Sequence, residues 1–181
     1  MKKHKLIAAL VLPLVVFIAL IFYKQAKVSM GEEVILPITG FDPRNILSGH
    51  YLIYEIDFGL ESDNYCSVID SRSADVYLCL NRDKKKGDLY RSSVNDYYNE
   101  SELYNAGCDA VIKGRCRYGR FIPDGEIEKF YIPEEYAHSL DRAVRNGKGK
   151  IVLSVTRGGS AVIKDLLIDD KSWKEYKEEK K

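Results

Sequence analysis

An apolar run near the N-terminus constrains this chain more than any other feature. Residues 6–23 form 18 successive positions without a charged side chain. At a rise of about 1.5 Å per residue, a helix of that length approaches the thickness of the hydrocarbon core of a bilayer. Pro13 lies inside the run, and proline is tolerated in membrane helices. We therefore expect a single N-terminal transmembrane helix over 6–23.

The charges on either side of the run predict its orientation. Three lysines lie in the basic flank 1–5, whereas only Lys24 and Lys27 follow the run closely. This surplus of positive charge favours a cytoplasmic N-terminus. We expect an anchor in the cytoplasmic (inner) membrane with the rest of the chain outside the cytoplasm.

A cleaved signal peptide is the alternative interpretation of the run. The run is longer than a usual signal-peptide core, and no Ala-x-Ala site follows it. Met30, in Val28-Ser29-Met30, is bulky for a cleavage site. Both interpretations export the domain that follows, and a mature N-terminus near Gly31 would identify cleavage.

The remainder of the chain predicts one α+β domain, mainly antiparallel β, with one main helix. Hydrophobic residues make up 45% of the chain and charged residues 30%, so a core can form. A polar linker is expected over 24–32, the β-rich domain over 33–170 and a charged tail over 171–181. The net charge of +1 argues against a nucleic-acid partner, which would need a basic face.

Hydrophobic periodicity places the elements of this domain. Proline at the first helical position and an Asn-Gly pair at the end bound a helix over 133–146. Arg157-Gly158-Gly159-Ser160 lies between two apolar runs and predicts a hairpin. Gly114 is expected to break its strand. The expected strands cover 33–38, 51–58, 75–81, 111–118, 126–132, 151–156 and 161–168.

The stretch 41–58 begins as turns and ends as a strand. Asp42-Pro43-Arg44 and Ser48-Gly49 carry turn residues. From Tyr51 onward, apolar and polar side chains alternate, which is typical of a half-buried strand. The side chains expected to point inward are Leu52, Tyr54, Ile56 and Phe58.

Four cysteines follow the anchor, at Cys66, Cys79, Cys108 and Cys116. An even number outside the cytoplasm suggests disulfides. Pairs Cys66–Cys79 and Cys108–Cys116 are favoured because each closes a local loop. Free buried thiols and a metal site are the alternatives, although no C-x-x-C spacing supports a metal.

No catalytic motif stands out, and no cofactor or metal is expected. His50 and His138 lie apart from each other and from any metal-binding spacing. Ser29 after the anchor and Lys86 later in the chain follow the order of a Ser/Lys signal peptidase. Lys86 belongs to a run of three lysines, which indicates a solvated loop, whereas a lysine base needs burial.

The stretch Asp42-Pro43-Arg44-x-x-Leu47-Ser48-Gly49-x-Tyr51, followed by an alternating strand, resembles the membrane-associated family named for its GDYXXLXY motif. Phe130-Tyr131-Ile132-Pro133-Glu134, the helix after it and the final hairpin are also similar to that family. Three motif positions differ here: His50 replaces Asp, Tyr54 replaces Leu, and Ile56 replaces Tyr. The resemblance implies architecture and membrane location, and it implies no activity.

These observations lead to three hypotheses about function. The first is a non-enzymatic, membrane-anchored envelope protein whose outer domain contacts a membrane or envelope partner. The second is binding of a small anionic ligand at the turn, with Arg44 as donor, or the same turn as a structural clamp. The third is the Ser/Lys protease. The motif residues in question are Asp42, Pro43, Arg44, Gly49, His50 and Tyr51.

Overall fold

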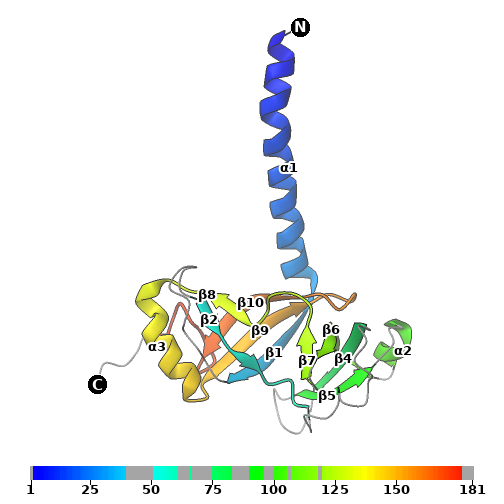
Figure 1. The fold of residues 1–181 in the computed structure, drawn as a ribbon, viewed down its shortest axis with the longest axis vertical. Coiled ribbons are helices and arrows are strands. Elements are labelled where there is room, and N and C mark those ends of the chain that lie inside the picture. The colour runs from blue at the N-terminus through cyan, green and yellow to red at the C-terminus, as the bar shows by residue number, and fades with distance from the viewer. Residues whose placement is uncertain are drawn as a thin grey trace.

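In the computed structural model, a β-rich domain lies at the foot of one long helix (Figure 1). Among the residues that the structure describes, all strand pairs are antiparallel and fall into three sheets. The predicted mainly antiparallel β architecture is confirmed, and the described residues form three helices rather than one main helix after an anchor. The structure describes residues 2–39, 51–60, 66, 75–82, 90–95, 100–105, 107–117 and 120–176.

The largest sheet has the strand order β11-β10-β9-β1-β3. Its strands are β1 (Glu32–Thr39), β3 (Glu55–Ile56), β9 (Gly149–Val155), β10 (Ala161–Ile168) and β11 (Lys171–Ser172). The predicted hairpin is present as β9–β10. Its turn is closed by bonds from Thr156 N to Ser160 O (2.9 Å) and from Gly159 N to Thr156 O (2.9 Å). Gly159 has φ +82°, the left-handed conformation that a three-residue hairpin loop requires.

The segment expected to be a charged tail from residue 171 begins with the short strand β11. Asp169 and Asp170 have φ values of 50° and 63°, as in a two-residue type I′ turn. This turn returns the chain to β10, where Ile168 pairs with Lys171 and Leu167 with Ser172. The strand expected over 161–168 ends before these aspartates. They form the turn that leads into the short strand β11.

A four-stranded sheet has the order β5-β4-β6-β7. Its strands are β4 (Asp75–Arg82), β5 (Tyr90–Asn95), β6 (Ala110–Arg117) and β7 (Arg120–Pro123), and α2 (Glu100–Asn105) lies between β5 and β6 in sequence. The expected break at Gly114 is wrong, because β6 continues through it. A Cβ there would lie 2.4 Å from Ile122 O and 2.6 Å from the Phe121 ring. Glycine thus permits close packing of β7.

The third sheet consists of β2 (Tyr51–Ile53) and β8 (Lys129–Tyr131). The strand expected over 51–58 is therefore divided into β2 and β3, which belong to different sheets. The strand expected over 126–132 is shorter because the chain turns before it, with φ +97° at Gly125. The change of sheet occurs at Tyr54, between β2 and β3.

Helix α3 (Glu134–Arg145) matches the predicted helix closely. Pro133 precedes it with extended backbone angles. At its end, Gly147 N bonds to Val144 O (2.9 Å) and Lys148 N to Ala143 O (3.2 Å), which is a Schellman motif. Its buried side chains are Leu140, Ala143 and Val144.

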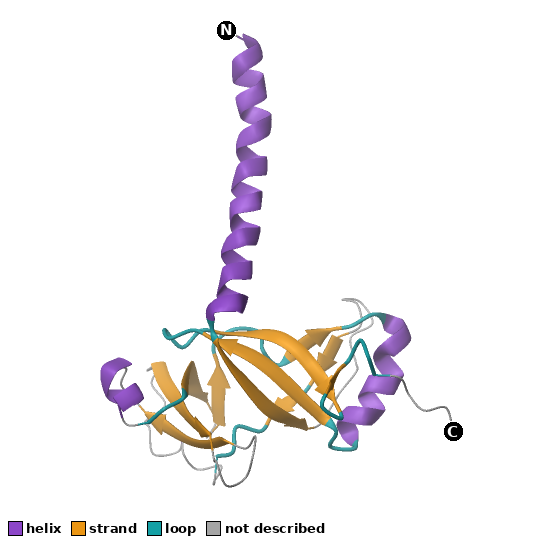
Figure 2. Cartoon of the chain, turned by 180° about the vertical axis from the view of Figure 1, so that it is seen from behind, coloured by secondary structure: helices purple, strands orange, loops and turns teal. Residues whose placement is uncertain are grey.

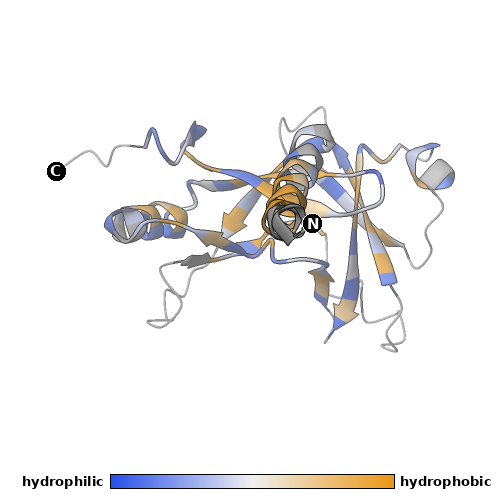
Figure 3. Cartoon of the chain, turned by 90° about the horizontal axis from the view of Figure 1, so that it is seen from above, coloured by the Kyte–Doolittle hydropathy of each residue, from blue (hydrophilic) through white to orange (hydrophobic). Residues whose placement is uncertain are grey.

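Helix α1 (Lys2–Met30) stands away from the domain, and only its C-terminal end contacts β9 and β10 (Figure 2). It continues through most of the expected linker 24–32, because residues 24–30 contain neither glycine nor proline. Large apolar side chains between Leu10 and Tyr23 are 43% to 73% exposed. Figure 3 views α1 end-on and shows hydrophobic colouring on its ribbon. Among the described residues, no helix has the length and apolar character needed to cross a membrane.

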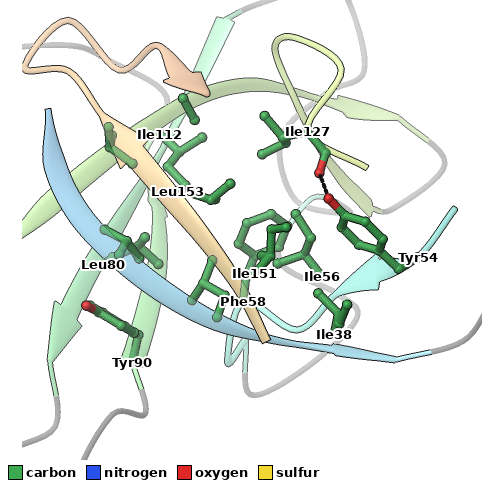
Figure 4. Packing of buried hydrophobic residues seen from close by; sticks show 14 of the residues in the cluster. Ile38, Tyr54, Ile56, Phe58, Leu80, Tyr90, Ile112, Ile127, Ile151 and Leu153 are labelled. Atoms are coloured by element: carbon green, nitrogen blue, oxygen red, sulfur yellow. Dashed lines mark hydrogen bonds between the residues drawn. The ribbon is translucent and has the colours of Figure 1, made fainter. Parts of the chain in front are cut away.

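One hydrophobic core joins all three sheets (Figure 4). Tyr54, Ile56 and Phe58 are buried in it, as the alternation predicted. The side chain of Leu52 lies outside the described residues. A smaller cluster of Cys79, Leu103, Cys108 and Val111 lies where α2 approaches the four-stranded sheet.

Candidate functional site

Most of the predicted motif residues lie outside the part of the chain that the structure describes. These are Asp42, Pro43, Arg44, Gly49 and His50. The anion-binding and clamp hypotheses for Arg44 therefore stay predictions. Tyr51 is the first residue of β2, where it pairs with Tyr131 of β8. The described half of the motif region, residues 51–60, can be followed residue by residue.

Tyr54 holds the point at which the chain changes sheet. Its side chain is 3% exposed, and its hydroxyl donates a 2.8 Å hydrogen bond to Ile127 O (Figure 4). Its backbone N–H donates to Glu128 O at 3.3 Å. Burial, and then the negative charge of Glu128, raise the pKa of Tyr54 far above its ordinary value. The phenol therefore keeps its proton and acts as a donor to the β7–β8 connection.

The residues after β3 attach the segment 51–60 to the five-stranded sheet and to the four-stranded sheet. Asp57 N donates to Pro37 O of β1 at 2.9 Å. The hydroxyl of Ser92, on β5, donates to Phe58 O. Gly59 has φ +67°, and a Cβ there would lie 2.2 Å from Tyr90 O. Residues 51–60 thus contact all three sheets and hold them together.

The cysteines form two disulfides, Cys66–Cys116 and Cys79–Cys108. The expected pairs Cys66–Cys79 and Cys108–Cys116 are wrong. Closeness in sequence misled the prediction, because Cys79 and Cys108 lie on β4 and just before β6, which are neighbours in the sheet. The second bond is nested within the loop that the first bond closes.

The described residues include only one member of the predicted Ser/Lys pair. Ser29 is exposed near the end of α1, and Lys86 lies outside the described residues. The protease hypothesis therefore stays untested. The described residues contain no group of three or more His, Cys, Asp or Glu side chains placed to hold a metal.

A groove of about 670 Å³ lies between the β7–β8 connection, β8 and the β9–β10 hairpin. The backbone of Lys113, on β6, is hydrogen-bonded to two walls of the groove. Its N–H donates to Gly159 O at 2.8 Å, and its carbonyl accepts from Asp124 N at 2.9 Å. Gly125 and Gly158 also line the groove, so parts of its rim carry no side chain.

The groove has an apolar floor and a charged rim. Ile127 and Ala161 are buried, whereas Phe130 and Ile163 are half-buried. At the rim, Lys113 and Asp75 form a 2.6 Å ion pair, and this hydrogen bond raises the pKa of Lys113. Such a groove suits an apolar group with polar flanks better than it suits a small anion.

Sequence reasoning missed this groove because its walls come from distant segments. Arg157-Gly158-Gly159-Ser160 was interpreted only as a hairpin turn. The available signal was that the turn has two glycines. A turn of this kind needs one residue with positive φ, which is Gly159, whereas Gly158 has open space beside it. The approach of residues 124–131 to β10 has no counterpart in local sequence patterns.

Comparison with known proteins gives one match. A family model described as GDYXXLXY protein matches residues 13–166, which is most of the chain. Neither a curated protein nor a solved structure matches significantly.

Proposed function

The chain belongs to the GDYXXLXY protein family, and from that premise we propose that it is a membrane-anchored interaction protein of the cell envelope. In this proposal, α1 anchors the chain in the cytoplasmic membrane. The β domain lies outside the cytoplasm and contacts a membrane or envelope partner without catalysing a reaction.

The observation that carries the proposal is the exposure of the apolar side chains of α1. Leu10, Phe17 and Phe22 are 64% to 73% exposed on a helix that stands away from the domain. Contiguous apolar surface of this extent is rare on proteins surrounded by water. Each fully buried Leu or Phe gains about 1.5–3 kcal/mol relative to exposure. A lipid environment would supply that burial.

The two disulfides support an oxidising location for the domain. Disulfides persist outside the cytoplasm and are rare within it, where thiols are kept reduced. Both bonds lie within residues 66–116 and fasten the four-stranded sheet. This argument is independent of α1.

Membrane fractionation with carbonate washing tests the anchor. We expect the full chain to stay in washed membranes. The double substitution Val15→Arg and Ile18→Arg should release it, because each arginine at a helix centre costs about 2.5 kcal/mol or more on insertion. Ile122→Arg is the matched control, since Ile122 is an exposed apolar residue of the domain. Release of the unsubstituted chain by carbonate would contradict the proposal.

A further inference from the structure

The open edge of β10 faces the groove. Thr156 and Ser160 form a hydrogen-bonded pair, because Thr156 N donates to Ser160 O. Hydrogen-bonded and non-hydrogen-bonded pairs alternate along antiparallel strands. The pairs Val155–Ala161 and Leu153–Ile163 are therefore non-hydrogen-bonded. The N–H and C=O groups of Ala161 and Ile163 consequently point away from β9.

Outside the strand ladders, the described part of the chain shows no backbone hydrogen bond to these four groups. β11 covers β10 only at Leu167 and Ile168. Ala161 is nevertheless 5% exposed, so its polar groups lie at a surface that offers water little access. Buried backbone groups are almost always paired, and open strand edges are templates for another strand. Both Ala161 and Ile163 line the groove.

The shape of the groove admits a second backbone. A Cβ added at Gly158 would have no atom within 4 Å. A Cβ added at Gly125 would have only Ala161 O in that range, at 3.8 Å. Glycine at such positions permits close approach of another chain. The floor would accept an apolar side chain of that chain, and the charged rim at Glu126 and Lys129 would accept polar flanks.

The position of the groove indicates where the partner lies. The C-terminal end of α1 contacts β9 and β10, the strands whose hairpin forms one wall (Figure 2). We propose that the groove binds an extended segment next to a membrane span of another membrane protein, which adds as a strand to β10 at Ala161 and Ile163. The location of this partner rests on the function proposed above, whereas the strand pairing rests on the groove alone.

Site-specific photo-crosslinking in native membranes tests this inference. A photoreactive amino acid replaces Val162 in the groove, and the control replaces Asn146, which is exposed at the end of α3. Mass spectrometry should find crosslinks from position 162, and not from 146, to a segment flanking a membrane span of another protein. Crosslinks only to lipid or to a second copy of this chain, or none, would overturn the inference.

Two variants test whether the backbone edge makes the contact. Ile163→Pro removes an N–H that the β9 pairing does not use, so the crosslink should fall at least about five-fold, the effect of one hydrogen bond. Gly158→Trp fills open space at the rim and should do the same, whereas Gly158→Ala should not. Thermal unfolding and intact disulfides establish that each variant is folded. An undiminished crosslink in folded Gly158→Trp would overturn the inference.

The same membranes separate the two proposals. If the chain resists carbonate washing but gives no crosslink from position 162, the groove inference fails and the anchoring proposal stands. If carbonate releases the unsubstituted chain, the anchoring proposal fails, and with it the location assigned to the partner.

Discussion

Tyr54 shows how a single residue can hold several elements in place. It stands where the family motif has leucine, and it keeps an inward-facing apolar side chain while adding a hydroxyl. That hydroxyl is the buried donor to Ile127 O at 2.8 Å. Because Ile127 lines the floor of the groove, Tyr54 connects the motif region with the groove.

Tyr54→Phe should lower the free energy of unfolding by about 1–2 kcal/mol. The substitution removes the donor and leaves the carbonyl of Ile127 buried without it. Urea unfolding followed by fluorescence measures the change. Tyr136→Phe is the control, because the Tyr136 ring packs edge-on against Trp173 and that contact remains. Equal stability of the Tyr54→Phe variant and the unsubstituted chain would refute this role.

The raised pKa of Tyr54 predicts a specific dependence on pH. The folded chain keeps the phenolic proton at pH values where the unfolded chain, with an ordinary value of 10.0, loses it. The stabilisation is therefore complete below pH 10 and decreases as the pH rises above it. Unfolding measured between about pH 9 and 11 should show a steeper loss for the unsubstituted chain than for Tyr54→Phe. Parallel curves would contradict the assignment.

At the scale of elements, sequence patterns located most strands but not their partners. The β9–β10 hairpin and α3 were predictable because their turn and cap residues are adjacent in sequence. The division of 51–58 between two sheets was not, since Tyr54 continues the same alternation as its neighbours. The groove depends on the approach of β8 to β10, which are about 30 residues apart and in different sheets.

Gly114 illustrates the difference between local propensity and packing. Gly114→Ala should destabilise the chain by about 1–3 kcal/mol, because the new methyl group would overlap Ile122 O and the Phe121 ring. Gly158→Ala is the matched control: its Cβ meets nothing within 4 Å, and no change beyond about 0.5 kcal/mol is expected. Similar melting temperatures for both variants would show that β7 can move aside.

At the scale of the whole molecule, the nested disulfides fasten the four-stranded sheet. Cys66–Cys116 spans 50 residues of sequence, so it restricts the unfolded chain by about 4 kcal/mol in the chain-entropy treatment. Replacing both cysteines by alanine should lower the free energy of unfolding by about 2–4 kcal/mol. Peptide mapping without reduction should recover Cys66 with Cys116 and Cys79 with Cys108. A peptide linking Cys66 to Cys79 would contradict the described connectivity.

Whole-molecule organisation was partly readable from sequence. The apolar run predicted an N-terminal helix and the even cysteine count suggested disulfides, and both are present. Export of the domain stays a prediction. The cysteine pairing was not readable, because it follows the order of strands in the sheet rather than distance along the chain. The proposed anchor and the groove near its end now form one testable arrangement, a β domain held against the outer face of a membrane.

Membrane topology tests this arrangement most directly. Right-side-out and inverted vesicles containing the full chain are treated with protease, and the fragments are identified by mass spectrometry. The account predicts that the β domain is cleaved in right-side-out vesicles and protected in inverted ones. Protection in right-side-out vesicles with cleavage in inverted ones would contradict it.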